Sequence, residues 1–280
     1  MINFNFHQHT LFSDGKEEPE KYIEEALKLK FKAMGFSEHS PLPFETPFSL
    51  KQDNITRYVN EIEKLKKKYS GQIAVYRALE LDYIPGLSED FEHWKDACKT
   101  DYSIGGVHLV KPGNTDALWF TDGPDRNVYD SGIESFFDND IRKAVTTYYH
   151  QLNRMIETQI FDVVAHVDKI KMHNQDRFFK EDEKWYRNLV SETLTLIKEK
   201  QLIAEINTRG IYKKRSEKLF PDDETLRQVV KMKIPVIISS DAHKPGEINL
   251  FFDYAVKRLI ESGGKSIWFF NGRTWEERAL

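Results

Sequence analysis

Two short motifs, one near each end of the chain, carry the residue types that bind metal ions. His7 and His9 stand two positions apart, and Asp241 and His243 repeat this spacing. In an extended segment, residues i and i+2 point to the same side and lie about 6.6 Å apart, which suits two ligands of one ion. Imidazole together with carboxylate suits zinc, iron or manganese. The two pairs therefore predict a site for a divalent metal ion.

Further candidate ligands follow other short apolar stretches of the chain. They are His39, Glu80, His108 and His166. With the first two pairs, six of the nine histidines fall in this set, and each follows an expected strand directly or within a few residues. The set offers more nitrogen and oxygen ligands than one ion of four to six coordination can use, so more than one metal ion is expected. Cys98 is the single cysteine, which argues against a structural thiolate site.

The composition limits the class of protein and its partners. Hydrophobic residues make up 40% and charged residues 31% of the 280 residues, enough for a sizeable core. The net charge is −4 and no block of Lys and Arg could neutralise a run of phosphates, so we expect no nucleic-acid partner. The sequence shows neither a long apolar run nor a secretion signal, so we expect a cytoplasmic protein with no membrane partner. Nothing in the sequence indicates an oligomeric state.

Short β-rich stretches alternate with longer stretches of helical period. Strands are expected over residues 2–6, 32–37, 73–79, 102–107, 161–165, 202–206, 235–240 and 266–270. Helices are expected over 18–30, 50–69, 89–99, 140–158, 180–200, 222–233 and 251–263. Repeated βα units indicate an α/β fold with a parallel sheet, and the lack of a G-x-G-x-x-G turn favours a closed barrel over an open sheet. In a barrel the carboxyl ends of the strands meet at one mouth, which would gather the candidate ligands.

Two long connections, 40–49 and 110–138, interrupt the alternation. Loops of this length in a compact domain often carry function. We find no internal repeat and no linker, so residues 1–280 are expected to form a single domain.

Seven motifs, in order along the chain, resemble those of the polymerase-and-histidinol-phosphatase (PHP) family. They are His7-x-His9, Phe12-Ser13-Asp14-Gly15, Ser37-Glu38-His39, Leu79-Glu80-Leu81-Asp82, Gly106-Val107-His108, Ala165-His166-Val167-Asp168 and Ser240-Asp241-Ala242-His243. The chain length and the segment Glu205-Ile206-Asn207-Thr208 are most similar to the histidinol-phosphate phosphatases of that family. The resemblance implies a distorted (β/α)7, TIM-like barrel, one strand fewer than the sequence pattern predicts.

The resemblance also implies three divalent metal ions (Zn, Fe or Mn) at the mouth of the barrel. One ion would take His7, His9, Glu80 and Asp241. A second would take His108 and His166 and share Glu80, and the third would take Asp14, His39 and His243. Asp14 stands where other relatives have a histidine, and the members that act on histidinol phosphate resemble this acidic variant.

These residues lead to a hypothesis about the reaction. We expect hydrolysis of a small-molecule phosphate ester, L-histidinol phosphate, in histidine biosynthesis, by attack of a metal-bridging hydroxide. Clustered divalent ions lower the pKa of bound water from about 15.7 toward roughly 7 and neutralise phosphoryl charge. Glu80 is expected to bridge the metal ions and Asp241 to accept the proton. Arg209 is expected to contact a phosphoryl oxygen, with Asn207, Lys213 and Arg215 as further candidates for substrate binding.

The leaving group and the alternatives depend on the two long connections, where one sequence says little. Phe44, Glu45, Trp119 and Asp122 are candidates for the wall that contacts the leaving group. The same ligands would serve a phosphoesterase acting on a nucleotide or sugar phosphate. A deaminase or amidase would need fewer metal ions, and a metal-binding module without turnover would not need the complete ligand set.

Overall fold

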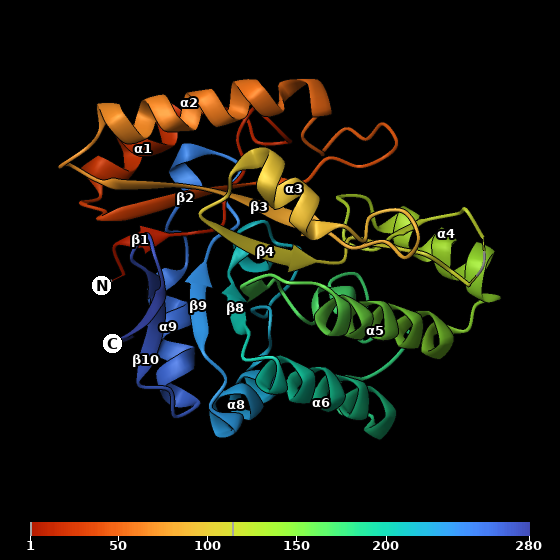
Figure 1. Ribbon diagram of the computed structural model, residues 1–280. Coiled ribbons are helices and arrows are strands. Elements are labelled where there is room, and N and C mark those ends of the chain that lie inside the picture. The colour runs from red at the N-terminus through yellow and green to blue at the C-terminus, as the bar shows by residue number, and fades with distance from the viewer. Residues whose placement is uncertain (1, 114) are drawn as a thin grey trace.

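Seven parallel strands form the central sheet, in the order β1-β2-β3-β4-β7-β8-β9. The computed structural model describes residues 2–113 and 115–280. The strands are β1 (Phe4–Asn5), β2 (Ala33–His39), β3 (Ala74–Asp82), β4 (Tyr102–Gly106), β7 (Val163–Val164), β8 (Ile203–Asn207) and β9 (Val236–Ser239). Gln8, beyond β1, bridges Ala242, beyond β9, and the His9 N–H donates to the Ala242 carbonyl at 2.8 Å. The sheet is therefore a nearly closed, distorted barrel (Figure 1), which confirms the expected fold class.

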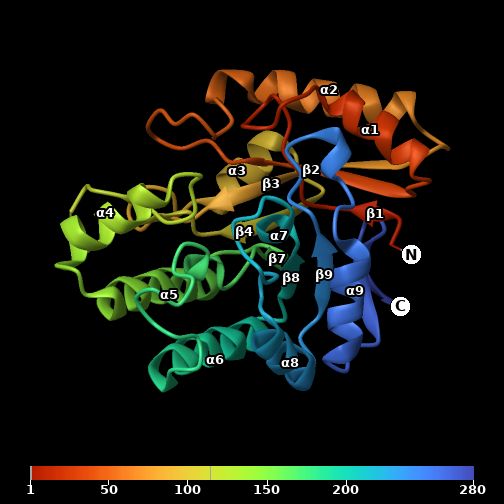
Figure 2. The same cartoon turned by 180° about the vertical axis from the view of Figure 1, so that it is seen from behind.

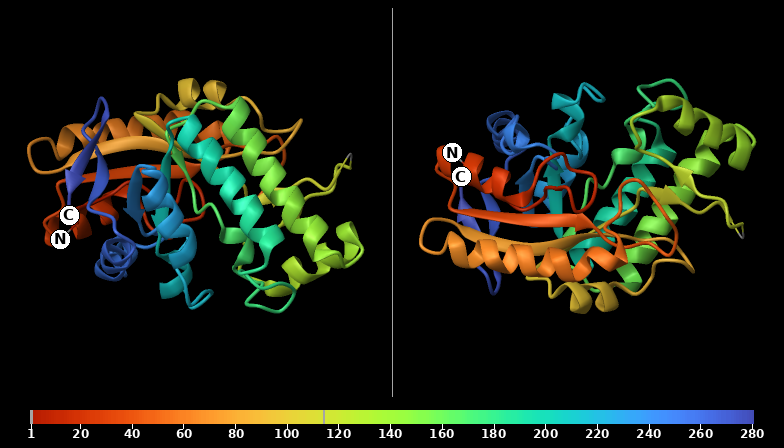
Figure 3. Two further views of the ribbon diagram at one scale, coloured as in Figure 1. Left: turned by 90° about the horizontal axis from the view of Figure 1, so that it is seen from below. Right: turned by 90° about the horizontal axis from the view of Figure 1, so that it is seen from above.

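Helices surround the barrel on its outside (Figures 1 and 3). The longer ones are α1 (Pro19–Lys28), α2 (Ile55–Lys68), α3 (Phe91–Cys98), α4 (Arg126–Phe137), α5 (Ile141–Thr158), α6 (Lys184–Glu199), α8 (Asp223–Met232) and α9 (Phe252–Glu261). Each buries one apolar face, as α2 does with Tyr58, Ile62 and Leu65. The Tyr58 hydroxyl also lies within hydrogen-bond distance of two strand carbonyls, 2.9 Å from Phe36 O and 2.8 Å from Ala78 O.

The eighth expected strand forms, but outside the barrel. β10 (Ser266–Phe270) pairs antiparallel with β11 (Trp275–Ala279), and the two make a separate hairpin beside both chain termini (Figures 1 and 3). The ring of Trp275 lies 5.5 Å from the rings of both Phe6 and Tyr102. The Trp275 indole N–H also donates to Asp162 Oδ1 at 3.3 Å. Because Tyr102 begins β4 and Asp162 directly precedes β7, the hairpin covers the amino-terminal end of the barrel. The barrel has seven strands, as the family resemblance implied.

The expected connection 110–138 is wrong as a continuous loop. The short strands β5 (Leu109–Val110) and β6 (Trp119–Phe120) pair with each other, and α4 follows them, above α5 in the view of Figure 2. The α4 N-terminus is capped by the Asp125 carboxylate, which accepts from the Asn127 N–H at 2.9 Å. Gly132 made this segment resemble a loop in the sequence. The structure requires glycine at this position, because a Cβ atom there would lie 2.0 Å from the Trp119 ring.

Short helical turns complete the loops at the carboxyl ends of the strands. They are α7 (Arg209–Tyr212) and the 3-10 turns η1 (Gln52–Asn54), η2 (Lys169–Lys171) and η3 (Pro245–Glu247). Across the two described ranges, no helix has both the length and the apolar character needed to cross a bilayer.

Candidate metal centre

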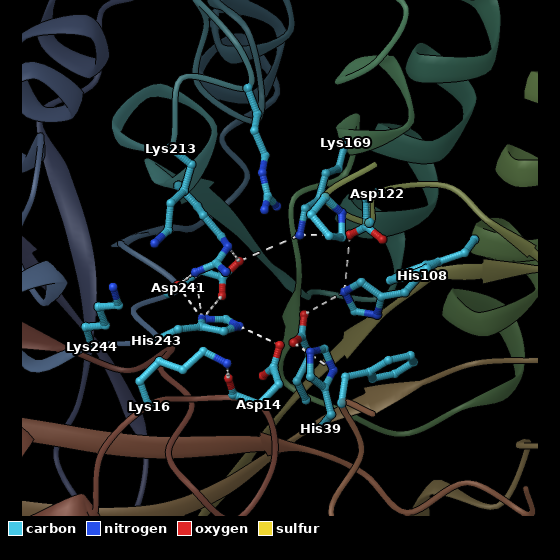
Figure 4. Close-up of a pocket in the computed structure, with 17 residues that line it drawn as sticks. Asp14, Lys16, His39, His108, Asp122, Lys169, Lys213, Asp241, His243 and Lys244 are labelled. Carbon is cyan, nitrogen blue, oxygen red and sulfur yellow. Dashed lines mark hydrogen bonds and ion pairs between the residues drawn. The ribbon is translucent and has the colours of Figure 1, made fainter. Parts of the chain in front are cut away.

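All nine sequence-predicted ligands lie together at the carboxyl ends of the strands. Together with Asp122, they form four overlapping groups in which one ligand atom from each residue lies within 4.8 Å of the others. The groups are His7/His9/Asp241, His9/Asp14/His39/His243, His39/Glu80/His108 and His108/Asp122/His166. Figure 4 shows Asp14, His39, His108, Asp241 and His243 around one cavity. The barrel thus gathers residues that lie as much as 236 positions apart, from His7 to His243.

Glu80, on β3, lies at the middle of the centre and is 1% exposed. Its Oε2 atom lies 3.2 Å from His7 Nε2, 3.3 Å from His9 Nε2 and 3.3 Å from His39 Nδ1. Its Oε1 atom lies 3.3 Å from His108 Nε2 and 3.1 Å from His166 Nε2. One carboxylate therefore faces five imidazoles, which is the placement required of a group shared between metal ions.

Asp14 and His243 close the side of the centre nearest the solvent. Asp14 Oδ2 lies 3.0 Å from His243 Nε2, and the ring of His9 stacks on that of His39 at 4.4 Å. The loop that carries Asp14 is tied to β2, because the Glu38 carboxylate accepts hydrogen bonds from the Thr10 N–H at 3.0 Å and from its hydroxyl at 2.6 Å.

Burial and charge set the protonation states of these groups. Burial raises the pKa of Asp241, but Arg209 and His7 more than offset this and hold it well below its usual range. Burial, together with Arg209 and His9, lowers the pKa of His243 to about 4. Asp241 is therefore ionised and His243 neutral at pH 7, which are the forms that bind cations.

Two histidines are instead poised to hold protons until a cation displaces them. Burial lowers the pKa of His9, but hydrogen bonds to Asp241 and Glu80 raise it to about 9. For His7, burial is likewise outweighed by carboxylates, first Glu205, and the pKa lies well above its usual value. Metal binding at these imidazoles would release protons.

Two further carboxylates hold the imidazoles from behind, and the ligand reasoning from sequence did not single them out. Asp82 Oδ2 lies 3.1 Å from His39 Nδ1, and its other oxygen accepts from His108 Nδ1. Glu205 Oε1 lies 2.5 Å from His7 Nδ1. Such contacts fix the tautomer and orientation of a metal-binding histidine. Asp82 could have been inferred, since it stands two positions after Glu80 on an extended strand.

Backbone strain also accumulates at the centre. Asp241 has φ 49° and His166 has φ 22°, both in the left-handed region that residues other than glycine rarely adopt. Such conformations persist where surrounding contacts over-determine them, and they cluster at functional sites.

The donor atoms fit divalent cations. Four buried atoms of the centre have no hydrogen-bond partner within the described part of the chain: His9 Nδ1, Asp14 Oδ1, Asp122 Oδ1 and His166 Nδ1. Imidazole nitrogens also face each other, with 3.2 Å between His7 Nε2 and His9 Nε2 and 3.3 Å between His108 Nε2 and His166 Nε2. A cation between the two Nε2 atoms of each pair would use both of their lone pairs, and the unpartnered atoms offer further ligands.

The sequence-predicted candidates for substrate binding differ in what they contact in the structure. Arg209 and Arg215 line the pocket of about 350 Å³ beside the centre, and so does Lys213, whose ammonium is paired with Glu247. Arg209 Nη1 lies 2.6 Å from the Asp241 carbonyl and 2.6 Å from His243 Nδ1, so one edge of its guanidinium positions two candidate ligands.

Asn207 and Lys169 extend this set. Asn207 is fully buried, and its Nδ2 lies 3.4 Å from Asp241 Oδ2. Lys169 was missed from sequence; its Nζ lies 2.9 Å from Asp122 Oδ2 and 3.6 Å from Asp241 Oδ2. Because Lys169 lies in the turn η2, only the tertiary fold brings it to the pocket.

Comparison with known proteins identifies the family. Residues 5–209 match the PHP domain. The chain belongs to the PHP domain family. The match ends before Asp241 and His243, yet both lie in the centre with His7 and His9, so the loop after β9 completes the candidate metal centre of this PHP domain.

Curated relatives of this PHP domain are similar over nearly their whole length. The chain is 28% identical over 267 residues to the Bacillus subtilis histidinol-phosphatase, covering 90% of this chain and 97% of that protein. It is 26% identical over 266 residues to the probable histidinol-phosphatase of Deinococcus radiodurans, covering 94% of this chain and 95% of the relative.

Solved structures share the fold of this PHP domain. The hisK protein of Listeria monocytogenes superposes with a TM-score of 0.79 at 19% identity, over 90% of this chain and 99% of the other. Histidinol phosphate phosphatase from Lactococcus lactis, crystallised with Zn, L-histidinol and phosphate, gives a TM-score of 0.72 at 20% identity, over 98% of each chain.

Proposed function

We propose that this protein hydrolyses L-histidinol phosphate to L-histidinol and phosphate. The observation that carries the proposal is the gathering of nine carboxylate and imidazole ligands beside a pocket that also contains Arg209 and Lys169. Relatives named histidinol-phosphatase align over nine-tenths or more of this chain and support the choice of substrate. The Lactococcus lactis structure, which holds L-histidinol and phosphate, supports it further.

Three divalent ions are proposed as cofactors, with zinc foremost because the Lactococcus lactis structure holds Zn. His7, His9, Glu80 and Asp241 would hold the first ion, and Asp14, His39 and His243 another. His108 and His166 would hold the remaining ion and share Glu80, with Asp122 as an added ligand. Bound divalent ions would supply a nucleophile at neutral pH and neutralise charge on the phosphoryl oxygens.

The chain's own residues would position the ester and move the proton. Arg209 and Lys169 bring positive charge to the pocket side of Asp241, where a phosphoryl oxygen would accept their hydrogen bonds. Asp241 Oδ1 faces His9 at 3.4 Å, while Oδ2 faces Lys169 and Arg209. Oδ2 is thus the atom that would accept the proton of the attacking water.

The experiment is a phosphate-release assay on the purified protein with L-histidinol phosphate. Chelation is expected to abolish activity, zinc or manganese to restore it, and Asp241→Asn, assayed with excess metal, to lower kcat by roughly 10²- to 10⁴-fold. Metal analysis is expected to find three ions per chain. Full activity in a metal-free preparation would refute the reaction proposed here.

A phosphoesterase acting on a nucleotide or sugar phosphate is the second candidate. The observation in its favour is the cationic rim of the pocket, where Lys16, Lys213, Arg215 and Lys244 would accept a more anionic ester. The same assay, run on a panel of nucleotides and sugar phosphates, decides between the two: a higher kcat/KM for any of these than for L-histidinol phosphate favours the second.

A further inference from the structure

The pocket beside the metal centre has two chemically unlike sides. Figure 4 shows Lys16, Lys213 and Lys244 on the side of His243, across the cavity from His108. The same pocket is lined by two aromatic side chains, Phe48 and Phe120. The residues proposed to bind metal and phosphate thus do not account for the apolar part of the pocket formed by Phe48 and Phe120.

Phe48 and Phe120 stack on each other next to the centre. Their ring centroids lie 5.5 Å apart with an interplanar angle of 22°. The ring of Phe48 also contacts the candidate ligand His39, at 5.2 Å and 70°. Both phenylalanines are only partly buried, and both pack on a small apolar cluster made of Leu42, Ile84 and Leu109. The pair therefore begins at the metal centre and presents apolar surface to the pocket.

The position of Phe120 is fixed from behind by backbone. A Cβ atom at Gly123 would lie 2.7 Å from Phe120 Cε1, so only glycine leaves room for the ring. The Gly123 carbonyl in turn lies 2.8 Å from Nε2 of the buried His173. The aromatic surface is held in place before any ligand binds, which lowers the entropic cost of using it.

Three of the four residues expected from sequence to contact the leaving group lie elsewhere. Trp119 is 1% exposed and its indole N–H donates to the Tyr129 carbonyl at 3.1 Å, against α4. Phe44 and Glu45 line a separate hollow formed by the loop 42–53. Of the four candidates, only Asp122 lines the metal pocket. Alternation along β6 explains the position of Trp119, since Trp119 and Phe120 point to opposite sides of this strand.

We propose that the stacked pair Phe48–Phe120 binds a flat ring in the leaving alcohol of the substrate. Phosphate held by the metal centre and by Arg209 would direct the ester group toward the opposite, aromatic side of the pocket. A planar heteroaromatic ring can extend an offset stack, and a cationic one gains from the negative ring face as well. The inference rests on the proposed function for the identity of that ring, the imidazole of L-histidinol.

The test compares Phe48→Leu with Phe44→Leu. Both residues lie on one loop and pack on one cluster, but only Phe48 lines the metal pocket. Leucine keeps the apolar volume and removes the ring. For each protein, kcat and KM are measured with L-histidinol phosphate and with O-phosphoethanolamine, a ringless amino-alcohol phosphate. In Phe48→Leu the ratio of the two kcat/KM values is expected to fall roughly 5- to 15-fold, mainly through KM.

Inhibition by the two products gives an independent readout. In Phe48→Leu, L-histidinol is expected to inhibit roughly 5- to 15-fold more weakly, while inhibition by inorganic phosphate changes much less. Phe120→Leu is expected to behave in the same way, and Phe44→Leu to retain the wild-type ratio. Zinc content and melting temperature confirm that each variant is folded and loaded.

Two results with the variants overturn the inference: an unchanged ratio of the two kcat/KM values in Phe48→Leu, or the same change of ratio in Phe44→Leu. Failure of the proposed function gives a different result. One such result is that the wild type hydrolyses another ring-bearing ester, such as a nucleotide, in a reaction that depends on Phe48. That result would support the aromatic subsite and refute L-histidinol phosphate as the substrate. If the wild type prefers ringless esters, the subsite itself is refuted.

Discussion

Replacing Asp82 by asparagine is expected to disturb two metal-binding groups at once. The Asp82 carboxylate is 1% exposed and uses one oxygen for His39 Nδ1 and the other for His108 Nδ1. An asparagine side chain has one carbonyl oxygen, and its amide group would turn N–H toward the second imidazole N–H. One histidine therefore keeps a weakened, neutral acceptor and the other loses its acceptor altogether.

The size of the effect follows from counting the altered contacts. Loss of an outer contact to a metal-binding histidine costs about 10- to 100-fold in metal affinity or activity. Asp82→Asn loses one such contact and weakens a second, so zinc affinity is expected to fall about 100-fold, or about 2.7 kcal/mol. Glu205→Gln alters the support of a single imidazole, that of His7, and is expected to cost roughly tenfold.

The assay is competition for zinc with a chromophoric chelator, with stoichiometry from elemental analysis. Asp101→Asn is the matched control, because Asp101 accepts from the Arg77 N–H at 2.7 Å at the amino end of the barrel, away from the metal centre. Asp82→Asn is expected to lose metal at chelator concentrations that leave the control loaded. Equal zinc affinity in the two variants would refute the reasoning from the outer carboxylate.

Three further substitutions test other parts of the structure. Lys171 lies 2.6 Å from carboxylates of both Asp168 and Asp222, so Lys171→Met should lower the free energy of unfolding in urea by about 3–5 kcal/mol. Burial raises the pKa of Asp222, but Lys171 more than offsets this and holds that pKa well below its usual range. The ionised Asp222 therefore stabilises the fold above about pH 4, and this stabilisation is lost as acid protonates the carboxylate. Without Lys171, acid unfolding should begin at a higher pH than in the wild type. Arg209→Lys should lower kcat/KM by roughly 10- to 100-fold, because Arg209 Nη1 contacts the Asp241 carbonyl and His243 Nδ1 while its Nε lies 3.8 Å from Asp241 Oδ2, and a single ammonium cannot occupy both nitrogen positions; an unchanged value contradicts its role. Trp275→Ala should cost about 2 kcal/mol of stability in thermal melts while kcat/KM stays within about twofold, and a large loss of activity would mean that the hairpin acts on the site.

The sequence predicts the position of a side chain well when that residue lies just after the end of a strand. The barrel is confirmed, and the nine candidate ligands lie together as expected, because the carboxyl ends of parallel strands must meet and because His7, His9, Asp241 and His243 lie within four residues of the ends of β1 and β9. Their binding of metal ions stays a prediction. The single-domain organisation stays a prediction.

What the sequence could not provide depends on tertiary contacts. Helix α4 was missed because Gly132 reads as a loop residue, whereas its role is to admit the Trp119 indole. Lys169 reaches the pocket only through the turn η2. Phe48 and Phe120 are adjacent although 72 positions apart in the chain, and no local pattern indicates their stacking.

The β10–β11 hairpin has a kinetic consequence for the proposed reaction. Since its aromatic side chains cover the amino end of the barrel, ester and products share the route at the carboxyl end. Phosphate bound beside the metal centre would lie deepest, so the alcohol is expected to dissociate first and phosphate last. The next ester cannot enter until phosphate has gone, which makes phosphate a competitive inhibitor and histidinol a noncompetitive one.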